Sequence, residues 1–143
     1  MISAKAAPRN WNTAILYGYV ATGSVLGGVA RYLLSLVLQF GTEFPWATLF
    51  VNVTGSFIIG FYSTLSGPDG RLFASARQRQ FVMTGFCGGY TTFSTFSLET
   101  FRLLHAGKLQ AAYTNIGLSV VAWLVAVWLG YRLANRLNRL KGS

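Results

Sequence analysis

A group of small and polar residues interrupts an otherwise apolar part of this sequence. Residues 84–97 read T-G-F-C-G-G-Y-T-T-F-S-T-F-S, with three glycines followed by five hydroxyl side chains in seven residues. A helix that is distorted in hydrocarbon must satisfy its freed backbone groups with protein, water or ions. Glycines followed by a hydroxyl cluster are therefore typical of a bend with a function, and this stretch is the candidate functional centre.

Two kinds of ion fit the chemistry of this stretch. A small, strongly hydrated anion needs uncharged donors such as Ser, Thr and Asn, which replace its water without holding it too tightly to leave. Phe93 and Phe96 lie three residues apart on one helix face, where they either present positive ring edges to an anion or pack as ordinary core. Carbonyls freed by a break from Gly88 to Thr91 are hard oxygen ligands, which suit a buried alkali cation of structural use.

The sequence excludes several other classes of function. Only one cysteine, Cys87, and one histidine, His105, are present. An internal disulfide framework, a clustered histidine metal site and a Ser-His-Asp triad are therefore out of reach within one chain. We expect no enzyme activity.

Composition places the chain in a membrane. Of its 143 residues, 52% are hydrophobic and 10% are charged, whereas about a quarter of the residues in soluble domains are charged. The net charge of +9 is spread over loops and termini beside apolar runs, which fits topology and anionic lipid better than nucleic acid. The polar leader, residues 1–12, lacks the features of a signal peptide and is predicted to be cytoplasmic.

The elements that must position these residues are predicted to be four transmembrane helices in one domain, residues 1–143. The spans cover about 13–38, 47–66, 81–104 and 109–133, the third broken near its middle, and the fold class is all-α. Gly23 and Gly27 form a G-x-x-x-G spacing that lets another helix approach closely. Because four such spans make a thin bundle with little room for an enclosed pore, we expect a dimer, with the glycine faces as candidate contacts.

Three polar residues within the spans leave alternatives open. Arg31 either extends to the membrane interface or raises the anion concentration at a vestibule. Asn52 either makes an interhelical hydrogen bond or points a donor into a water-filled pore. Glu99 lies either at the interface or in a functional position.

Three segments together resemble one family. They are G-F-C-G-G-Y-T-T-F-S-T-F-S-L-E (85–99), P-W-A-T-L-F-V-N-V-T-G (45–55) and G-G-V-A-R-Y (27–32), and they closely resemble the Fluc, or CrcB, fluoride channels. The resemblance extends over nearly the whole chain. It implies antiparallel, dual-topology homodimers in the cell inner membrane, with two fluoride pores and a central sodium ion, that let toxic fluoride leave the cytoplasm passively.

The resemblance also implies roles for single residues. Asn52 matches the pore asparagine, Phe93 and Phe96 the aromatic pair, and the carbonyls of Gly88 and Thr91 the sodium ligands. Thr95 and Ser97 match the hydroxyl track, and Glu99 matches the acidic residue at one pore end. Arg31 matches the vestibule arginine, and Ser119 matches a fourth-span serine. Asn115 falls where some relatives have tyrosine, so its role is not carried over.

The distribution of basic residues departs from a dual topology. With both termini on one side, that side carries nine basic residues and the other side carries Arg102 and Lys108; the nine are Lys5, Arg9, Arg71, Arg77, Arg79, Arg132, Arg136, Arg139 and Lys141. A chain that inserts both ways should be nearly balanced. Either an antiparallel homodimer overrides the rule or the chain pairs with an oppositely oriented homologue.

Two other functions compete with a channel. A proton-coupled exporter of the small multidrug resistance type also has four spans and dual topology, but it needs a carboxylate in its substrate chamber. The first span contains no acid, and Glu99 is a poor substitute. The third possibility is an assembly subunit that transports nothing.

Overall fold

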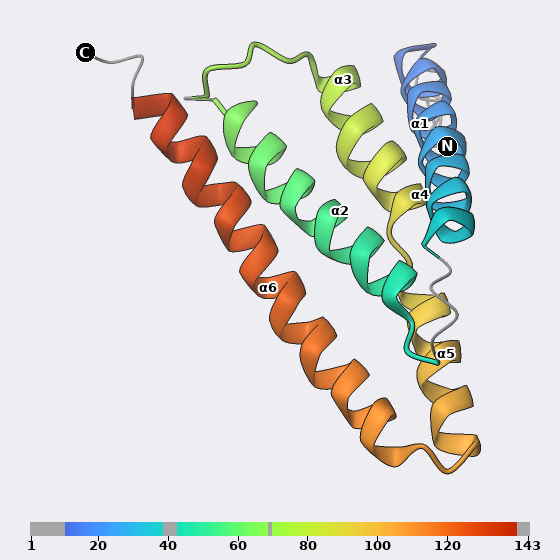
Figure 1. Cartoon of the computed structure of the whole chain (residues 1–143). Coiled ribbons are helices and arrows are strands. Elements are labelled where there is room, and N and C mark those ends of the chain that lie inside the picture. Colours follow the sequence, from blue (N-terminus) through green and yellow to red (C-terminus); the bar gives the residue numbers. More distant parts are fainter. Residues whose placement is uncertain (1–10, 39–42, 69, 140–143) are drawn as a thin grey trace, which may run out of the picture.

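A computed structural model describes residues 11–38, 43–68 and 70–139, and the regular secondary structure of these residues is entirely helical (Figure 1). The leader residues Lys5 and Arg9, and Lys141 near the C-terminus, lie outside the described residues. In chain order the elements are α1 (Trp11–Val37), α2 (Trp46–Leu65), α3 (Ala76–Gln80), the π-helical η1 (Phe81–Cys87), α4 (Gly88–Tyr90), α5 (Phe93–His105) and α6 (Leu109–Arg139).

Within the described residues, three helices are long and apolar enough to cross a membrane, which makes this a multi-pass membrane protein. They are Thr13–Val37, Trp46–Leu65 and Leu109–Arg139. In Figure 1 the chain passes along the bundle in alternating directions, so the start of α1 and the end of α6 lie at the same end. The last helix continues six residues beyond the predicted end at 133 and carries Arg136 and Arg139 in its last turn.

The polypeptide between α2 and α6 consists of shorter helical pieces. Ser75 begins α3 with a capping box, in which its hydroxyl accepts from the N–H of Gln78 and the Gln78 side chain accepts from the N–H of Ser75. The chain stays helical through η1 and α4, as far as Tyr90. Thr91 and Thr92 then have extended backbone with ψ angles of 158° and 118°, and α5 starts at Phe93.

The close approach of α1 to η1 and α4 depends on glycine. A Cβ on Gly23 would lie 2.5 Å from the carbonyl oxygen of Phe81, and one on Gly27 would lie 2.1 Å from that of Phe86. A Cβ on Gly89, on the facing helix, would lie 2.2 Å from the carbonyl oxygen of Ser24. The G-x-x-x-G face of α1 is therefore used within the chain, and the expectation that it contacts a second subunit is wrong.

A second helix pair, α2 with α6, is built in the same way. A Cβ on Gly60 would lie 2.2 Å from the carbonyl oxygen of Val127, and one on Gly130 would lie 2.3 Å from that of Phe57. Few side chains are buried in this arrangement, and large apolar side chains such as Tyr17, Val25 and Leu124 are more than half exposed. These faces are suited to lipid or to another protein chain.

Candidate functional site

The side chain of Asn52 stabilises the interruption between α4 and α5. Its Oδ1 accepts from the backbone N–H of Thr92 at 2.7 Å, and its Nδ2 donates to the Thr92 carbonyl at 2.9 Å. Asn52 is 5% exposed, so this pair of hydrogen bonds is buried. In a continuous helix the Thr92 N–H would donate to the carbonyl of Gly88, four residues earlier. Asn52 replaces that helical bond, which explains why the helix ends after the glycines and not at them.

Gly55, one turn further along α2, gives the interruption its room. A Cβ at this position would lie 2.2 Å from Cγ2 of Thr91. The predicted break, Gly88 to Thr91, therefore differs from the observed geometry, because Gly88 and Gly89 remain helical and the extended residues are Thr91 and Thr92.

Thr92 also caps α5. Its Oγ1 accepts from the N–H of Thr95 at 3.1 Å, and the two hydroxyls lie 2.9 Å apart in a hydrogen bond. An N-cap of this kind satisfies one of the unpaired donors in the first turn of a helix. The same buried residue thus binds α2 through its backbone and starts α5 through its side chain.

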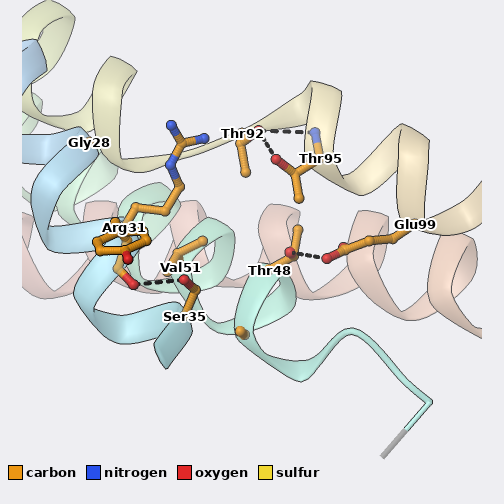
Figure 2. A pocket seen from close by; sticks show the side chains of 10 residues that line it. Gly28, Arg31, Ser35, Thr48, Val51, Thr92, Thr95 and Glu99 are labelled. Atoms are coloured by element: carbon orange, nitrogen blue, oxygen red, sulfur yellow. Dashed lines mark hydrogen bonds between the residues drawn. The ribbon is translucent and has the colours of Figure 1, made fainter. Parts of the chain in front are cut away.

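A pocket of about 420 Å³ lies between α1, α2 and α5, and it brings together Arg31, Thr95 and Glu99. Figure 2 shows Arg31 at one end of this pocket and Glu99 at the other, with Thr92 and Thr95 between them. The Arg31 side chain extends towards the segment that joins α4 to α5. A cation, hydroxyls and a carboxylate therefore follow one another along the same polar wall.

Glu99 is held by α2. Its Oε1 accepts from Oγ1 of Thr48 at 2.9 Å, while its Oε2 is buried and has no hydrogen-bond partner among the described residues. An unpartnered carboxylate oxygen in a polar pocket is a position for water or for a proton. Glu99 is thus placed in the pocket and not at an exposed helix end.

Phe93 and Phe96 contact each other but have different surroundings. Their ring centroids are 5.6 Å apart, yet Phe93 is 72% exposed and Phe96 is 7% exposed. Phe96 packs edge to face against Trp123 of α6, with centroids 5.0 Å apart and an interplanar angle of 74°. One ring is therefore inside the chain, and the other is on its surface.

Four residues connect α6 to α5 by hydrogen bonds. The Ser119 hydroxyl donates to Oδ1 of Asn115 at 3.4 Å, and Nδ2 of Asn115 donates to the Thr100 hydroxyl at 2.9 Å. Thr100 in turn donates to the carbonyl of Phe96 at 2.8 Å. Ser119 and Asn115 are each 1% exposed, so this chain of bonds positions the first turns of α5 from within the bundle.

The predicted site residues do not all converge. Arg31, Thr95 and Glu99 line the first pocket, and a second pocket of about 230 Å³ is lined by a set that includes Asn52 and Phe93. Three predicted pore residues line neither pocket: Phe96, Ser97 and Ser119. Ser97 is exposed and donates to the carbonyl of Phe93. These three stay predictions as pore residues.

Sequence reasoning did not predict the contacts by which Thr48, Thr92 and Thr100 support the site residues. Thr48 holds Glu99, Thr92 pairs with Asn52, and Thr100 links Asn115 to α5. Thr48 lies four residues before Asn52, on the same helix face, and this spacing is the signal that could have identified it.

The sequence matches a known family over most of its length. Residues 18–131 match the family described as CrcB-like protein, Camphor Resistance (CrcB). A protein of Rhodopseudomonas palustris named fluoride-specific ion channel FluC 1 is 67% identical over 91% of this chain and 94% of its own length. A protein of Bradyrhizobium diazoefficiens with the same name is 60% identical over 96% and 97%, and fluoride-specific ion channel FluC of Opitutus terrae is 56% identical over 90% and 98%. This chain belongs to the CrcB-like family.

Proposed function

We propose that this protein is a fluoride-selective channel that lets fluoride leave the cytoplasm passively and so lowers its toxicity. The observation that carries this proposal is the 67% identity, over nearly the full length of both chains, to a protein named as a fluoride-specific ion channel. The family is one of ion channels, so the chain is not an enzyme. The polar pockets beside the interruption support the assignment, because they offer hydroxyl and amide donors in a membrane-spanning bundle.

Within this proposal, the fluoride path follows the polar walls of the two pockets. Asn52 and Thr95 supply donors, and Phe93 supplies a ring edge. Ser97 and Phe96 line neither pocket, and their contribution to the path stays a prediction. Arg31 attracts anions at one end, Glu99 lies near the path on the α5 side, and Ser119 supports it from α6. The lining of the second pocket includes no charged side chain, which favours brief binding and release there.

The conducting form is an antiparallel homodimer. The 72% exposure of Phe93 supports this, because an aromatic ring at the chain surface lines a pore only if a second surface covers it. A two-fold axis through the interrupted segments would bring the same residues together twice. A heterodimer with an oppositely oriented homologue would use the same faces and would also account for the charge asymmetry.

A sodium ion at the dimer interface fits the residues around the interruption. The Gly88 carbonyl loses its usual helical donor, since the Thr92 N–H donates to Asn52, and the space beside the Gly88 Cα is open. Carbonyls of Gly88 and Thr91 are hard oxygen donors suited to an alkali cation. The ion would stabilise the point where the third membrane spans of the two subunits cross. Each of these spans is broken near its middle.

The protein is expected in the cell inner membrane, in contact with anionic lipid. Six described arginines of the loop and the last helix support this arrangement, because they lie at the end of the bundle where α6 ends; they are Arg71, Arg77, Arg79, Arg132, Arg136 and Arg139.

The decisive experiment is fluoride-electrode efflux from liposomes that hold the purified protein. We expect rapid release of fluoride and very slow release of chloride. Equal rates for the two halides would overturn selectivity, and no flux at all would favour a subunit that transports nothing. If the Glu99→Gln variant lost resistance to cationic drugs and kept its fluoride handling, the small multidrug type of exporter would be favoured.

A further inference from the structure

The indole N–H of Trp123 is a buried donor without an acceptor. Together with Oε2 of Glu99, it is one of two buried side-chain polar atoms that have no hydrogen-bond partner within the part of the chain that the structure describes. Buried polar groups in native proteins nearly always have a partner, so such a donor points to a ligand that is bound only at times.

Trp123 lies beside a pocket that offers donors from several elements. The pocket of about 230 Å³ is lined by Trp123, by Asn52 and Ser56 of α2, and by Thr92 and Phe93 around the interruption. One N–H of the Asn52 amide is used by the Thr92 carbonyl, and an amide carries two. Residues of α2 and α6 that carry unused donors thus line the same small space.

The chemistry of this pocket favours an anion. An indole N–H donates and cannot accept, so it repels a cation and gains most from a strong acceptor. The residues that line the pocket include no charged side chain. A small anion would therefore be held by uncharged donors alone, and it could leave again.

Packing against Phe96 restricts the indole ring of Trp123. Phe96 meets Trp123 edge to face, so the indole plane is held by a buried ring. Trp123 also follows Ser119 by four residues and Asn115 by eight, which places all three on one face of α6.

We propose that the Trp123 indole N–H binds fluoride directly as it passes through this pocket, and that Trp123 is a selectivity-determining residue of the channel. This inference rests on the proposed function. It assigns a role to an aromatic side chain that would otherwise count only as apolar packing between α5 and α6.

The test compares Trp123→Phe with Trp128→Phe. Phenylalanine keeps an aromatic ring against Phe96 and removes the N–H, whereas Trp128 lies on the same helix, is 52% exposed and stacks under Arg132. We expect fluoride efflux to slow about tenfold or more in Trp123→Phe, as the loss of one donor to a small anion predicts, and to be unchanged in Trp128→Phe.

A second measurement does not depend on the folding of a variant. The chain contains four tryptophans, so wild-type protein labelled with ¹⁵N in the indole gives four N–H resonances. Fluoride should shift the resonance that is missing in Trp123→Phe, and chloride should not. Suppose that wild-type protein conducts fluoride, that the resonance does not shift, and that efflux in Trp123→Phe is within twofold of wild type. This result would overturn the role of Trp123 and leave the proposed channel function standing. If wild-type protein does not conduct, the proposed function itself fails.

Discussion

At the scale of single residues, Asn52 combines a structural and a functional position. It replaces a helical hydrogen bond at Thr92, and it also lines a pocket. An asparagine can do both because its amide carries an acceptor and two donors, so one face pairs with a peptide group while a donor remains.

Asn52→Asp should abolish fluoride efflux and lower the stability of the protein. The carboxylate keeps the acceptor for the Thr92 N–H, but it places charge against the Thr92 carbonyl and repels an anion. The lost bond and the unpaired carbonyl should lower the free energy of unfolding by about 1–3 kcal/mol. Efflux and thermal unfolding in detergent measure the two effects.

Asn138→Asp is the matched control for this prediction. Asn138 also accepts from one backbone N–H, that of Arg71 at 2.9 Å, and donates to one backbone carbonyl, that of Thr64 at 3.2 Å, but its two partners are different residues and it lies at the end of α6. Equal loss of efflux in both variants would show that the effect of Asn52 comes only from stability.

Phe96→Ile should slow fluoride efflux while the oligomer stays intact. Isoleucine keeps the site apolar but removes the ring edge and the edge-to-face contact with Trp123, which contributes about 0.5–1.5 kcal/mol. If the anion loses about 1.4 kcal/mol of stabilisation, efflux slows about tenfold. Phe101→Ile, at a position of α5 that is 61% exposed, is the control, and unchanged efflux in Phe96→Ile would return this ring to a packing role.

At the scale of elements, glycine decides which helices pack together. Gly27 and Gly28 are neighbours on α1, yet a Cβ on Gly27 would meet the Phe86 carbonyl at 2.1 Å, while a Cβ on Gly28 would meet nothing within 4 Å. Backbone atoms cannot move aside as a flexible side chain does, so α1 would have to move away from η1 and α4.

Gly27→Ala should therefore destabilise the protein by about 1–3 kcal/mol, as overpacking of a tight contact does. Gly28→Ala, one residue away with open space, should leave stability nearly unchanged. The measurement is the temperature at which each variant loses its monodisperse peak in size-exclusion chromatography. Similar temperatures for both variants would contradict the close packing of α1 on η1 and α4.

At the scale of the whole molecule, the two ends of the bundle test the topology. Leu72 lies in the loop before α3 and Leu109 starts α6 at the other end, and both are exposed. We expect cysteines placed singly at these positions, in a Cys87→Ser background, each to be labelled in about half of the molecules by an impermeant reagent added to intact cells, because a dual-topology chain inserts both ways. Labelling of Leu109→Cys alone would instead show a single orientation and favour a heterodimer.

The proposed sodium ion is also a property of the assembly, because two carbonyls of one chain cannot enclose it. As a static ligand, it should not move with fluoride. A sodium gradient across the liposome should therefore neither drive fluoride flux nor be dissipated by it, as measured with a fluoride electrode and a sodium tracer together. Coupled movement of the two ions would contradict a structural site.

The sequence by itself determined what depends on residue type and order. Its apolar runs and low charge predict the membrane helices, because hydrocarbon requires them, and residues 84–97 locate the site by their glycines and hydroxyls. Only the tertiary structure decided which groups meet. The helix ends after Tyr90 because Asn52, forty residues earlier, takes the N–H of Thr92, and Gly23 and Gly27 pack within the chain because η1 and α4 lie against α1. Such long-range contacts depend on how the helices pack and are not encoded in local spacing.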